Sequence, residues 1–316
     1  MERVFITGAS GFVGKYLINI LTKENKYEIY GTKLPGEKVI IENVKLYDLD
    51  LTSKKNVESI IKETCPDIVF HLAALSSVKL SWENPTNTVD ININGTINLL
   101  EAIRKYNDKC KILLVGSSEE YGSTFSKISN PKESDECHPQ NMYAITKYTQ
   151  GKLGELYSNV YKMNIKMTRS FNHFGPGQSP NFVISDFCKQ AAEISLGKKE
   201  KIIKVGNLDV YRDFSDVRDV VNAYLEIVNN GTSGEIYNVG SSHSYQIRKI
   251  LDLIISISGE DIKVVVDKEK YRPSDIKKTV ANIDKLSNEL NYIHKYNIKE
   301  TIIETFNYWK NIINNK

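Results

Sequence analysis

Cysteine, histidine and long apolar runs are all scarce in this chain of 316 residues. The cysteines stand far apart, without a CxxC pair, at Cys65, Cys110, Cys137 and Cys188. Neither a disulfide framework nor a zinc site is therefore expected. The 5 histidines include no HExxH motif, so we expect no metal. No apolar stretch approaches the roughly 20 residues of a membrane helix, and no signal-peptide pattern is visible. These absences predict a cytoplasmic protein with no membrane partner.

An excess of charge of either sign is missing too. Lys and Arg number 42 against 39 Asp and Glu, a net charge of +3. Such a small and dispersed excess does not favour nucleic acid as a partner. The hydrophobic content of 41% and the charged content of 26% are ordinary for a soluble globular protein. The length allows a large core or two domains.

Short apolar runs alternate with helical periods along the first half of the chain. We predict strands at Val4–Ile6, Tyr27–Gly31, Asp67–Leu72, Lys111–Gly116 and Ile165–Arg169. Helices are predicted between them at Gly14–Glu24, Lys54–Glu63, Val89–Tyr106 and Tyr143–Tyr161. This order predicts an α/β fold with a doubly wound parallel sheet of the Rossmann type over residues 1–174. A Gly/Pro-rich stretch then opens a second, smaller α/β domain at 175–316, with residues 212–241 expected to pack back on the first.

A glycine-rich segment, TGASGFVG at Thr7–Gly14, directly follows the first predicted strand. Its three glycines permit a tight turn, close approach of backbone to a pyrophosphate, and close packing of the next helix on the sheet. That helix offers free N–H groups to the phosphates. A glycine triplet alone often marks an ordinary turn, but here strand, glycines and helix come in the order that dinucleotide binding requires. The predicted cofactor residues are Gly8, Gly11, Phe12, Val13 and Gly14.

The end of the second predicted strand indicates which nicotinamide cofactor is used. An NAD site places an acidic residue there to bind the ribose 2′-hydroxyl. This chain has Thr32 and Lys33 instead, which could donate hydrogen bonds to a 2′-phosphate. A hydrogen bond to a charged group contributes about 1.5–3 kcal/mol. We favour NADP(H), with NAD(H) as the alternative if Lys33 only points into solvent.

Tyr143 and Lys147 form a YxxxK pair, which places phenol and ammonium on one face of a helix. A tyrosine with its ordinary pKa near 10 is a poor base at neutral pH. A cation about 4 Å away, at an effective dielectric of about 20, stabilises the ionised phenol by about 4 kcal/mol. This predicts that Lys147 lowers the pKa of Tyr143. Ser117 follows the predicted strand Lys111–Gly116 and could bind the reacting oxygen.

These motifs together resemble the extended short-chain dehydrogenase/reductase family. Thr7–Gly14 meets its TGxxGFxG signature, and HLAA at 71–74 and an NxxGT pattern at 92–96 also fit. The resemblance implies catalysis by Ser117, Tyr143 and Lys147. It also implies further cofactor contacts from Asp50, Leu51, Leu72, Ala73, Ala74 and Asn92, together with Tyr143 and Lys147. His71 could be a ligand in isolation, but its place inside an apolar strand favours a core histidine whose hydrogen bonds are satisfied.

Later motifs resemble the nucleotide-sugar branch of that family. SSEEYG at Ser117–Gly122 places Glu119 where the branch has a catalytic glutamate, although one of two adjacent glutamates in a turn is often only solvated. An RxFNxxGP segment contains Asn172, and an RDFxxVxD segment contains Arg212. Guanidinium groups suit a diphosphate. The substrate residues that this resemblance implies are Ser76, Ser118, Glu119, Asn172, Val183, Lys189, Arg212 and Arg272.

Within the branch, the sequence resembles GDP-4-keto-6-deoxy-mannose reductases. The rival GDP-mannose 4,6-dehydratases carry two arginines where this chain has Gly177 and Gln178. They also carry two basic residues where this chain has Ser185 and Asp186. The resemblance implies hydride transfer from NAD(P)H to C4 of a GDP-4-keto-6-deoxy sugar, giving a GDP-6-deoxy sugar such as GDP-rhamnose. A 4,6-dehydratase, a C4 oxidase or epimerase, and a non-catalytic NADP-sensing regulator are the alternatives. The nucleotide base, the sugar's carbon count and its C4 stereochemistry stay open. The family usually forms homodimers, here expected through the helices Val89–Tyr106 and Tyr143–Tyr161.

Overall fold

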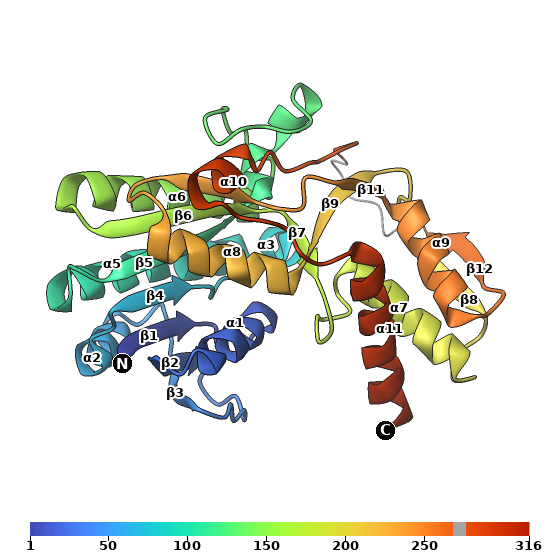
Figure 1. The fold of residues 1–316 in the computed structure, drawn as a ribbon, viewed down its shortest axis with the longest axis horizontal. Helices are drawn as coiled ribbons and strands as arrows, with labels where there is room; N and C mark the ends of the chain where they lie inside the picture. Colours follow the sequence, from blue (N-terminus) through green and yellow to red (C-terminus); the bar gives the residue numbers. More distant parts are fainter. Residues whose placement is uncertain (268–275, 316) are drawn as a thin grey trace.

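A seven-stranded sheet dominates the computed structural model, which describes residues 1–267 and 276–315. Its strands, in spatial order, are β10 (Ile236–Val239), β6 (Asn164–Ser170), β5 (Lys111–Ser117), β4 (Ile68–His71), β1 (Glu2–Thr7), β2 (Tyr27–Lys33) and β3 (Val44–Asp48). All six neighbouring pairs are parallel, which confirms the predicted doubly wound sheet (Figure 1). The strand order reverses between β1 and β4, and ligands of such sheets bind at that point, beyond the carboxyl ends of the strands.

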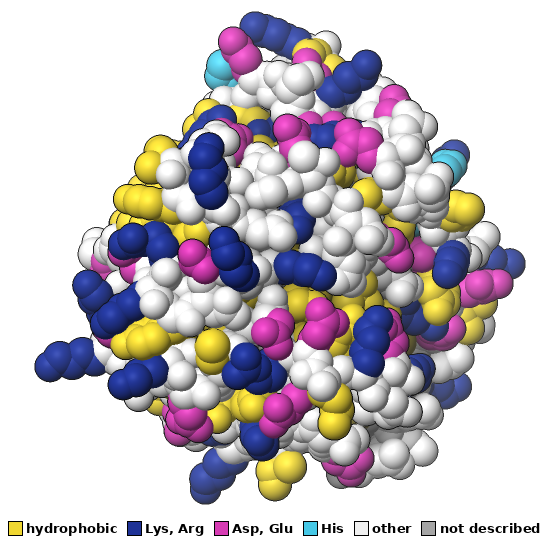
Figure 2. Space-filling model, turned by 60° about the vertical axis from the view of Figure 1, so that its left-hand side comes forward, with side chains coloured by type: hydrophobic (Ala, Val, Ile, Leu, Met, Phe, Trp, Pro, Cys, Tyr) yellow, Lys and Arg dark blue, Asp and Glu magenta, His cyan; other side chains and the backbone are white. Residues whose placement is uncertain are grey.

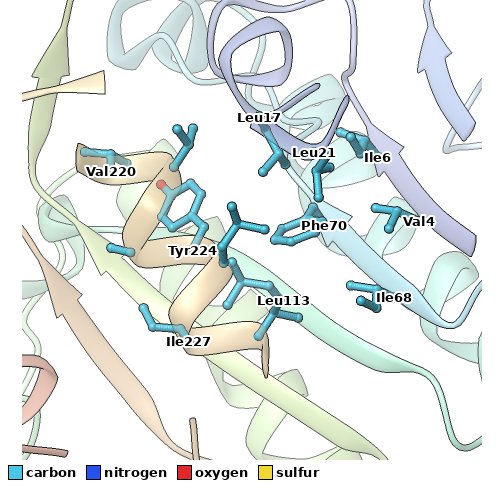
Figure 3. Close-up of a cluster of buried hydrophobic side chains, with 14 of the residues drawn as sticks. Val4, Ile6, Leu17, Leu21, Ile68, Phe70, Leu113, Val220, Tyr224 and Ile227 are labelled. Atoms are coloured by element: carbon cyan, nitrogen blue, oxygen red, sulfur yellow. The ribbon is translucent and has the colours of Figure 1, made fainter. Parts of the chain in front are cut away.

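Helices cover both faces of this sheet because its strands alternate their apolar side chains between the two faces. Val4 and Ile6 of β1 pack with α1 (Phe12–Lys23) and α8 (Val217–Asn230), as Figure 3 shows. The intervening Phe5 packs on the opposite face with α2 (Lys54–Thr64) and α5 (Gly95–Tyr106). Each of these large side chains is fully buried, which contributes about 1.5–3 kcal/mol per residue.

The predicted long helix at Val89–Tyr106 is interrupted by a wider turn. The chain forms α4 (Pro85–Val89), then the π-helical segment η1 (Asp90–Asn94), and then α5. Short π segments often occur at functional sites. This one carries Asn92, whose side chain accepts from the N–H of Leu75 at 2.8 Å and donates to its carbonyl at 3.2 Å. Asn92 thereby fixes the loop that follows β4, at the carboxyl edge of the sheet.

The later part of the chain forms a separate layer of short elements around its own core. Its strands are β7 (Asn172–Phe174), β9 (Tyr211–Asp216) and β11 (Ser244–Gln246) in one sheet, with β8 (Ile202–Val205) and β12 (Lys263–Val266) as a pair. Its helices are α7 (Val183–Ser195), α9 (Ile247–Ser258) and α11 (Ile298–Asn314). By contrast α8 and β10 join the large sheet, and the short helix α10 (Asp284–Leu290) packs against both.

Charges of both signs are interspersed over the face of the molecule shown in Figure 2, with small apolar patches between them. Within the part of the chain that the structure describes, no helix is both long enough and apolar enough to cross a membrane.

Candidate active site

The glycine-rich turn between β1 and α1 packs closely against neighbouring backbone at the point where the strand order reverses. Gly8 has a φ of +71°, which favours glycine, and a Cβ there would lie 3.1 Å from the backbone of Ala73. A Cβ on Gly14 would lie 2.6 Å from the carbonyl oxygens of Gly8 and Ala9. Phe12 and Val13 open α1, so its free N–H groups face this turn. These residues fit the pyrophosphate of a dinucleotide.

The end of β2 differs from what the sequence indicates. The Thr32 hydroxyl accepts from the N–H of Gly8 at 3.0 Å and is buried. Lys33 does not stand free in solvent, because its ammonium is bound by the Asp48 carboxylate and the Glu37 carbonyl. The carboxylate of Glu37 accepts a hydrogen bond from Ser10 of the glycine-rich turn at 2.9 Å. An acidic group therefore touches the cofactor turn, a feature that the sequence did not indicate.

The other predicted cofactor residues lie along the same edge of the sheet. Asp50 and Leu51 follow β3, and Leu51 packs so closely that a Cβ on Gly95 would lie 2.8 Å from it. Leu72, Ala73 and Ala74 follow β4 directly.

Beneath this edge, His71 bonds Thr7 and Thr96 through its two ring nitrogens, at 2.8 and 3.0 Å. Burial lowers the pKa of His71 to about 3, so it is a neutral core histidine whose hydrogen bonds are satisfied, as predicted.

Ser117, Tyr143 and Lys147 come together where β5 ends against α6 (Met142–Tyr161). Tyr143 stands in the first turn of α6, held by an N–H bond to the Ser81 hydroxyl at 3.2 Å. The Ser117 hydroxyl lies near enough to the Tyr143 phenol to lower its pKa against burial. One turn further, Lys147 is buried and donates to the carbonyl of Val115 at 2.8 Å. A phenol, a hydroxyl and an ammonium thus converge beside the dinucleotide cradle.

The electrostatics of this trio differ from the expected pattern. Burial raises the pKa of Tyr143, and the largest opposing effect comes from the Ser117 hydroxyl. Lys147 was expected to have that effect, but its ammonium is directed at the Val115 carbonyl and at Gln150, 2.8 and 2.9 Å away. Burial lowers the pKa of Lys147 to about 8, against the charge of Glu120, which raises it.

Glu119 lies beside this trio and joins it to the start of α6. Its carboxylate accepts from the side-chain amide of Asn141 at 3.0 Å. The side-chain oxygen of Asn141, Oδ1, accepts in turn from the N–H of Ala144, which caps the helix. Ser118 is the first residue of the 3₁₀ turn η2 (Ser118–Tyr121) that carries Glu119. The position of Glu119 beside Tyr143 fits contact with a substrate bound there.

Two predicted substrate residues lie on neighbouring strands of the smaller sheet. Asn172 of β7 pairs in register with Phe214 of β9, two residues from Arg212. The Asn172 amide donates to the carbonyl of Asp213 at 3.3 Å, and Arg212 donates to the carbonyls of Tyr211 and Ile276. The structure thus places an amide and a guanidinium close together at the start of the second layer.

The remaining substrate residues are more scattered. Ser76 is exposed in the loop after β4, and Val183 is the exposed first residue of α7. Lys189 lies elsewhere on α7, 3.7 Å from Glu193 and over the ring of Trp309. It lines a groove of about 630 Å³ beside β8, away from Ser117. Arg272 lies outside the described residues. The substrate roles of all four stay predictions.

Glu120 and Arg169 form a buried ion pair directly behind Ser117, which the sequence did not reveal. The Arg169 Nε lies 3.1 Å from a Glu120 carboxylate oxygen, and both side chains are at most 4% exposed. The doubled glutamate of SSEEYG was the available signal, but adjacent glutamates in a turn cannot be told apart from sequence alone. Here the first reaches the site and the second is buried.

The fold, the glycine cradle and the Ser117, Tyr143 and Lys147 trio define an NAD(P)-dependent nucleotide-sugar enzyme of the extended short-chain dehydrogenase/reductase type. The family model described as GDP-mannose 4,6 dehydratase matches residues 5–305. The chain belongs to this family.

Individual relatives resemble it over nearly their whole length. GDP-6-deoxy-D-mannose reductase from Pseudomonas aeruginosa is 29% identical over 98% of this chain and 97% of the relative. GDP-6-deoxy-D-talose 4-dehydrogenase from Aggregatibacter actinomycetemcomitans is also 29% identical, over 96% of each. Among solved structures, RMD from P. aeruginosa complexed with NADPH superposes with a TM-score of 0.87 at 28% identity, covering 99% of this chain and all of the other.

Proposed function

We propose that this enzyme reduces C4 of a GDP-linked 4-keto-6-deoxy sugar, giving a GDP-6-deoxy sugar such as GDP-rhamnose. The observation that carries the proposal is the meeting of Ser117, Tyr143 and Lys147 beside the glycine cradle. The similarity to a GDP-6-deoxy-D-mannose reductase over 98% of the chain supports the sugar. An intact proton donor also argues against a non-catalytic sensor, which needs none.

Each residue of the site has a separate role in this reaction. The bound nicotinamide cofactor supplies the hydride. Tyr143 donates its phenol proton to the C4 oxygen, and its raised pKa keeps that proton in place at neutral pH. Ser117 holds the C4 oxygen by a hydrogen bond, and Lys147 binds the nicotinamide ribose. Glu119 binds sugar hydroxyls. General acid catalysis of this kind typically contributes about 10²–10⁴-fold in rate.

The packing near α7 favours a reductase over a dehydratase. The arginine pair and the basic pair of the dehydratases would fall on Gly177, Gln178, Ser185 and Asp186. Gln178 is buried and donates to the carbonyl of His173 at 2.8 Å. The backbone carbonyl of Gln178 accepts from the hydroxyl of Ser185 at 2.6 Å, and the same hydroxyl accepts from the indole N–H of Trp309. An arginine at 185 would lack the hydroxyl that joins Gln178 to Trp309, and an arginine at 178 would place a charge at a position that is now buried and uncharged.

For the cofactor we propose NADP(H). The support is the lack of an acidic residue at the end of β2 and the similarity to a reductase structure complexed with NADPH. One observation favours NAD(H) instead, namely the Glu37 carboxylate bonded to Ser10 of the cofactor turn. A carboxylate there repels a 2′-phosphate and accepts a hydrogen bond from a 2′-hydroxyl.

A second candidate reaction is supported by the similarity to GDP-6-deoxy-D-talose 4-dehydrogenase. It involves the same carbon, but the C4 hydroxyl has the opposite configuration. A panel of nucleotide-linked 4-keto sugars, incubated with NADPH or NADH and followed by NMR of the products, separates the candidates. We expect turnover of the GDP-linked substrate and a product with the rhamnose configuration. A talose product supports the second candidate, and turnover of UDP- or dTDP-sugars alone contradicts the proposal.

We also propose that the enzyme is a homodimer that pairs through α5 and α6. Ile145, Leu156 and Val160 of α6 are 44, 52 and 59% exposed. Their spacing of 11 and 4 residues places them on one stripe of the helix. A second copy of the same stripe would cover these side chains. Leu156→Glu should therefore convert a dimer to a monomer in size-exclusion chromatography with light scattering.

A further inference from the structure

The carboxylate of Glu120 is sealed inside the protein and bound to the catalytic strand end. The residue is 2% exposed. One oxygen accepts from the backbone N–H of Ser117 at 2.8 Å, while the Ser117 hydroxyl accepts from the N–H of Glu119 at 3.2 Å. The two bonds form a capping box around η2. Glu120 therefore fixes the backbone from which the Ser117 side chain projects.

The space for this carboxylate is left by Gly116, whereas Gly151 lies in ordinary contact distance of it. A Cβ on Gly116 would lie 2.4 Å from a carboxylate oxygen of Glu120 and 2.2 Å from the carbonyl of Thr168. Gly151 of α6 faces the same carboxylate, with a Cβ position 3.8 Å from its other oxygen. The end of β5 at Gly116 thus leaves room for a buried carboxylate.

The positive partner is held equally firmly. Arg169 donates from Nε to Glu120 at 3.1 Å and from Nη1 to the carbonyl of Glu133 at 2.9 Å. Its guanidinium lies 4.7 Å from the centre of the Tyr121 ring. A buried ion pair of this kind often contributes no more stability than apolar residues of similar size. Stability alone therefore does not account for a buried charge at this place.

We propose that Glu120 is a positioning residue, which holds Ser117 by its hydrogen bond and keeps Lys147 cationic by its fixed negative charge. The inference rests on the roles proposed above for Ser117 and Lys147. Glu120 has no access to substrate, so it acts through these two groups. Burial raises the pKa of the Glu120 carboxyl, and the guanidinium of Arg169, which stays charged at all relevant pH values, is the largest effect that opposes this rise.

The surroundings of Lys147 make Glu120 its main anionic neighbour. The Lys147 ammonium is bonded to the Val115 carbonyl, two residues before the Ser117 N–H that the Glu120 carboxylate accepts from. The charge of Lys147 also lowers the pKa of His71 on β4, and Tyr143 lies one turn before Lys147 on α6, with Arg169 of β6 beyond Glu120. His71 is neutral, and Tyr143 keeps its proton. Glu120 raises the pKa of Lys147 against burial. Without that charge the pKa falls further, so Lys147 loses its proton at a lower pH.

The test measures NADPH and NADH affinity across pH by fluorescence, which needs no sugar substrate. In the wild type, affinity should fall as pH rises through about 8, where Lys147 loses its proton. The Lys147→Met variant should show no such step. Glu120→Gln keeps an acceptor for the Ser117 N–H but removes the charge. The pH at which this variant loses cofactor affinity should be about 1–3 units lower than in the wild type, the size expected for the loss of a nearby opposite charge.

Glu133→Gln is the matched control. Its carboxylate accepts from the backbone N–H of Asn238 at 2.8 Å in the same buried region but contacts neither catalytic residue. Its pH step should equal that of the wild type. If Glu120→Gln leaves Arg169 unpaired and fails to fold, the double variant E120Q/R169M removes both charges together and should show the same downward shift.

Two results overturn the inference. The first is a loss of cofactor affinity at the same pH as in the wild type, in folded E120Q or in E120Q/R169M. The second is a wild-type pH dependence that persists in Lys147→Met. Failure of the GDP-sugar assay leaves this titration unaffected, so it contradicts the proposed reaction alone.

Discussion

The catalytic corner and the substrate end of this enzyme are built in opposite ways. At the end of β5, Glu120, Lys147 and Arg169 are all at most 4% exposed and bonded to fixed partners. At the substrate end, Asn172 is exposed on a three-residue strand and Val183 is 37% exposed at a helix end. Bonds fixed before substrate arrives favour catalysis, because the site need not reorganise during the reaction. The bonds of the catalytic corner are thus in place before binding, whereas exposed side chains at the other end can still move.

The largest effect should come from removing the proton donor at the catalytic corner. Tyr143→Phe should reduce kcat by about 10²–10⁴-fold, the usual contribution of general acid catalysis, with KM nearly unchanged. Tyr148→Phe, the same change five residues along α6, should leave kcat within about twofold, since surface changes away from such features have small effects. Steady-state kinetics of both variants, with cofactor affinity measured separately, test this. A Tyr143→Phe enzyme with near-normal kcat would show that another group supplies the proton.

At the substrate end, the loss of one anchor should weaken binding and leave the chemistry intact. Arg212→Ala should raise KM for the nucleotide sugar about ten- to a hundredfold, because a hydrogen bond to a charged group contributes about 1.5–3 kcal/mol. NADPH affinity should not change. Calorimetric titration with each ligand measures the two effects. Loss of cofactor binding instead would show that Arg212 binds the cofactor and not the nucleotide sugar.

The two glycines beside Glu120 test how tightly the catalytic corner is packed. Gly116→Ala should lower the free energy of unfolding by about 1–3 kcal/mol, since its Cβ meets a carbonyl and a carboxylate well inside contact distance. Gly151→Ala is the matched control, because its Cβ has a nearest neighbour at 3.8 Å and alanine favours the helix. It should leave stability unchanged or raise it. Urea unfolding compares the variants; equal stability would mean that the corner can relax.

The smallest predicted effect concerns the choice between NADPH and NADH at the glycine-rich turn. Glu37→Gln should raise the affinity for NADPH relative to NADH about tenfold, because the change removes a carboxylate bonded to Ser10 of the cofactor turn. Lys33→Met should change the ratio little, since Asp48 already neutralises Lys33. If instead Lys33→Met weakens NADPH alone, the lysine binds the 2′-phosphate, as the sequence indicates.

The sequence predicts the regular half of the molecule because its signals are local. Strands and helices up to β6 differ in their apolar period, and the glycine-rich turn follows the first strand directly. β3 was missed because Val44–Asp48 is a partly exposed edge strand without a clear apolar run. The short strands around β9 pair with partners distant in sequence, which no local period reveals.

The residues proposed for catalysis follow from sequence motifs, but the contacts between them do not. The partner of Glu120 lies 49 residues away in Arg169. Lys33 was expected to bind a 2′-phosphate, but it pairs with Asp48, which lies on a strand that the sequence did not indicate. In both cases a charged side chain meets its partner only after the sheet has formed. The sequence identifies which chemical groups are present, and the fold decides which of them are paired.

The most direct test of the proposed reaction counts electrons. A reductase oxidises one NAD(P)H for each product formed, whereas a dehydratase returns its hydride to the same sugar. We predict that GDP-4-keto-6-deoxy-mannose causes loss of nicotinamide absorbance in a one-to-one ratio with product, and that GDP-mannose alone yields no 4-keto sugar. Conversion of GDP-mannose to a 4-keto-6-deoxy product with no net change in cofactor would contradict this account.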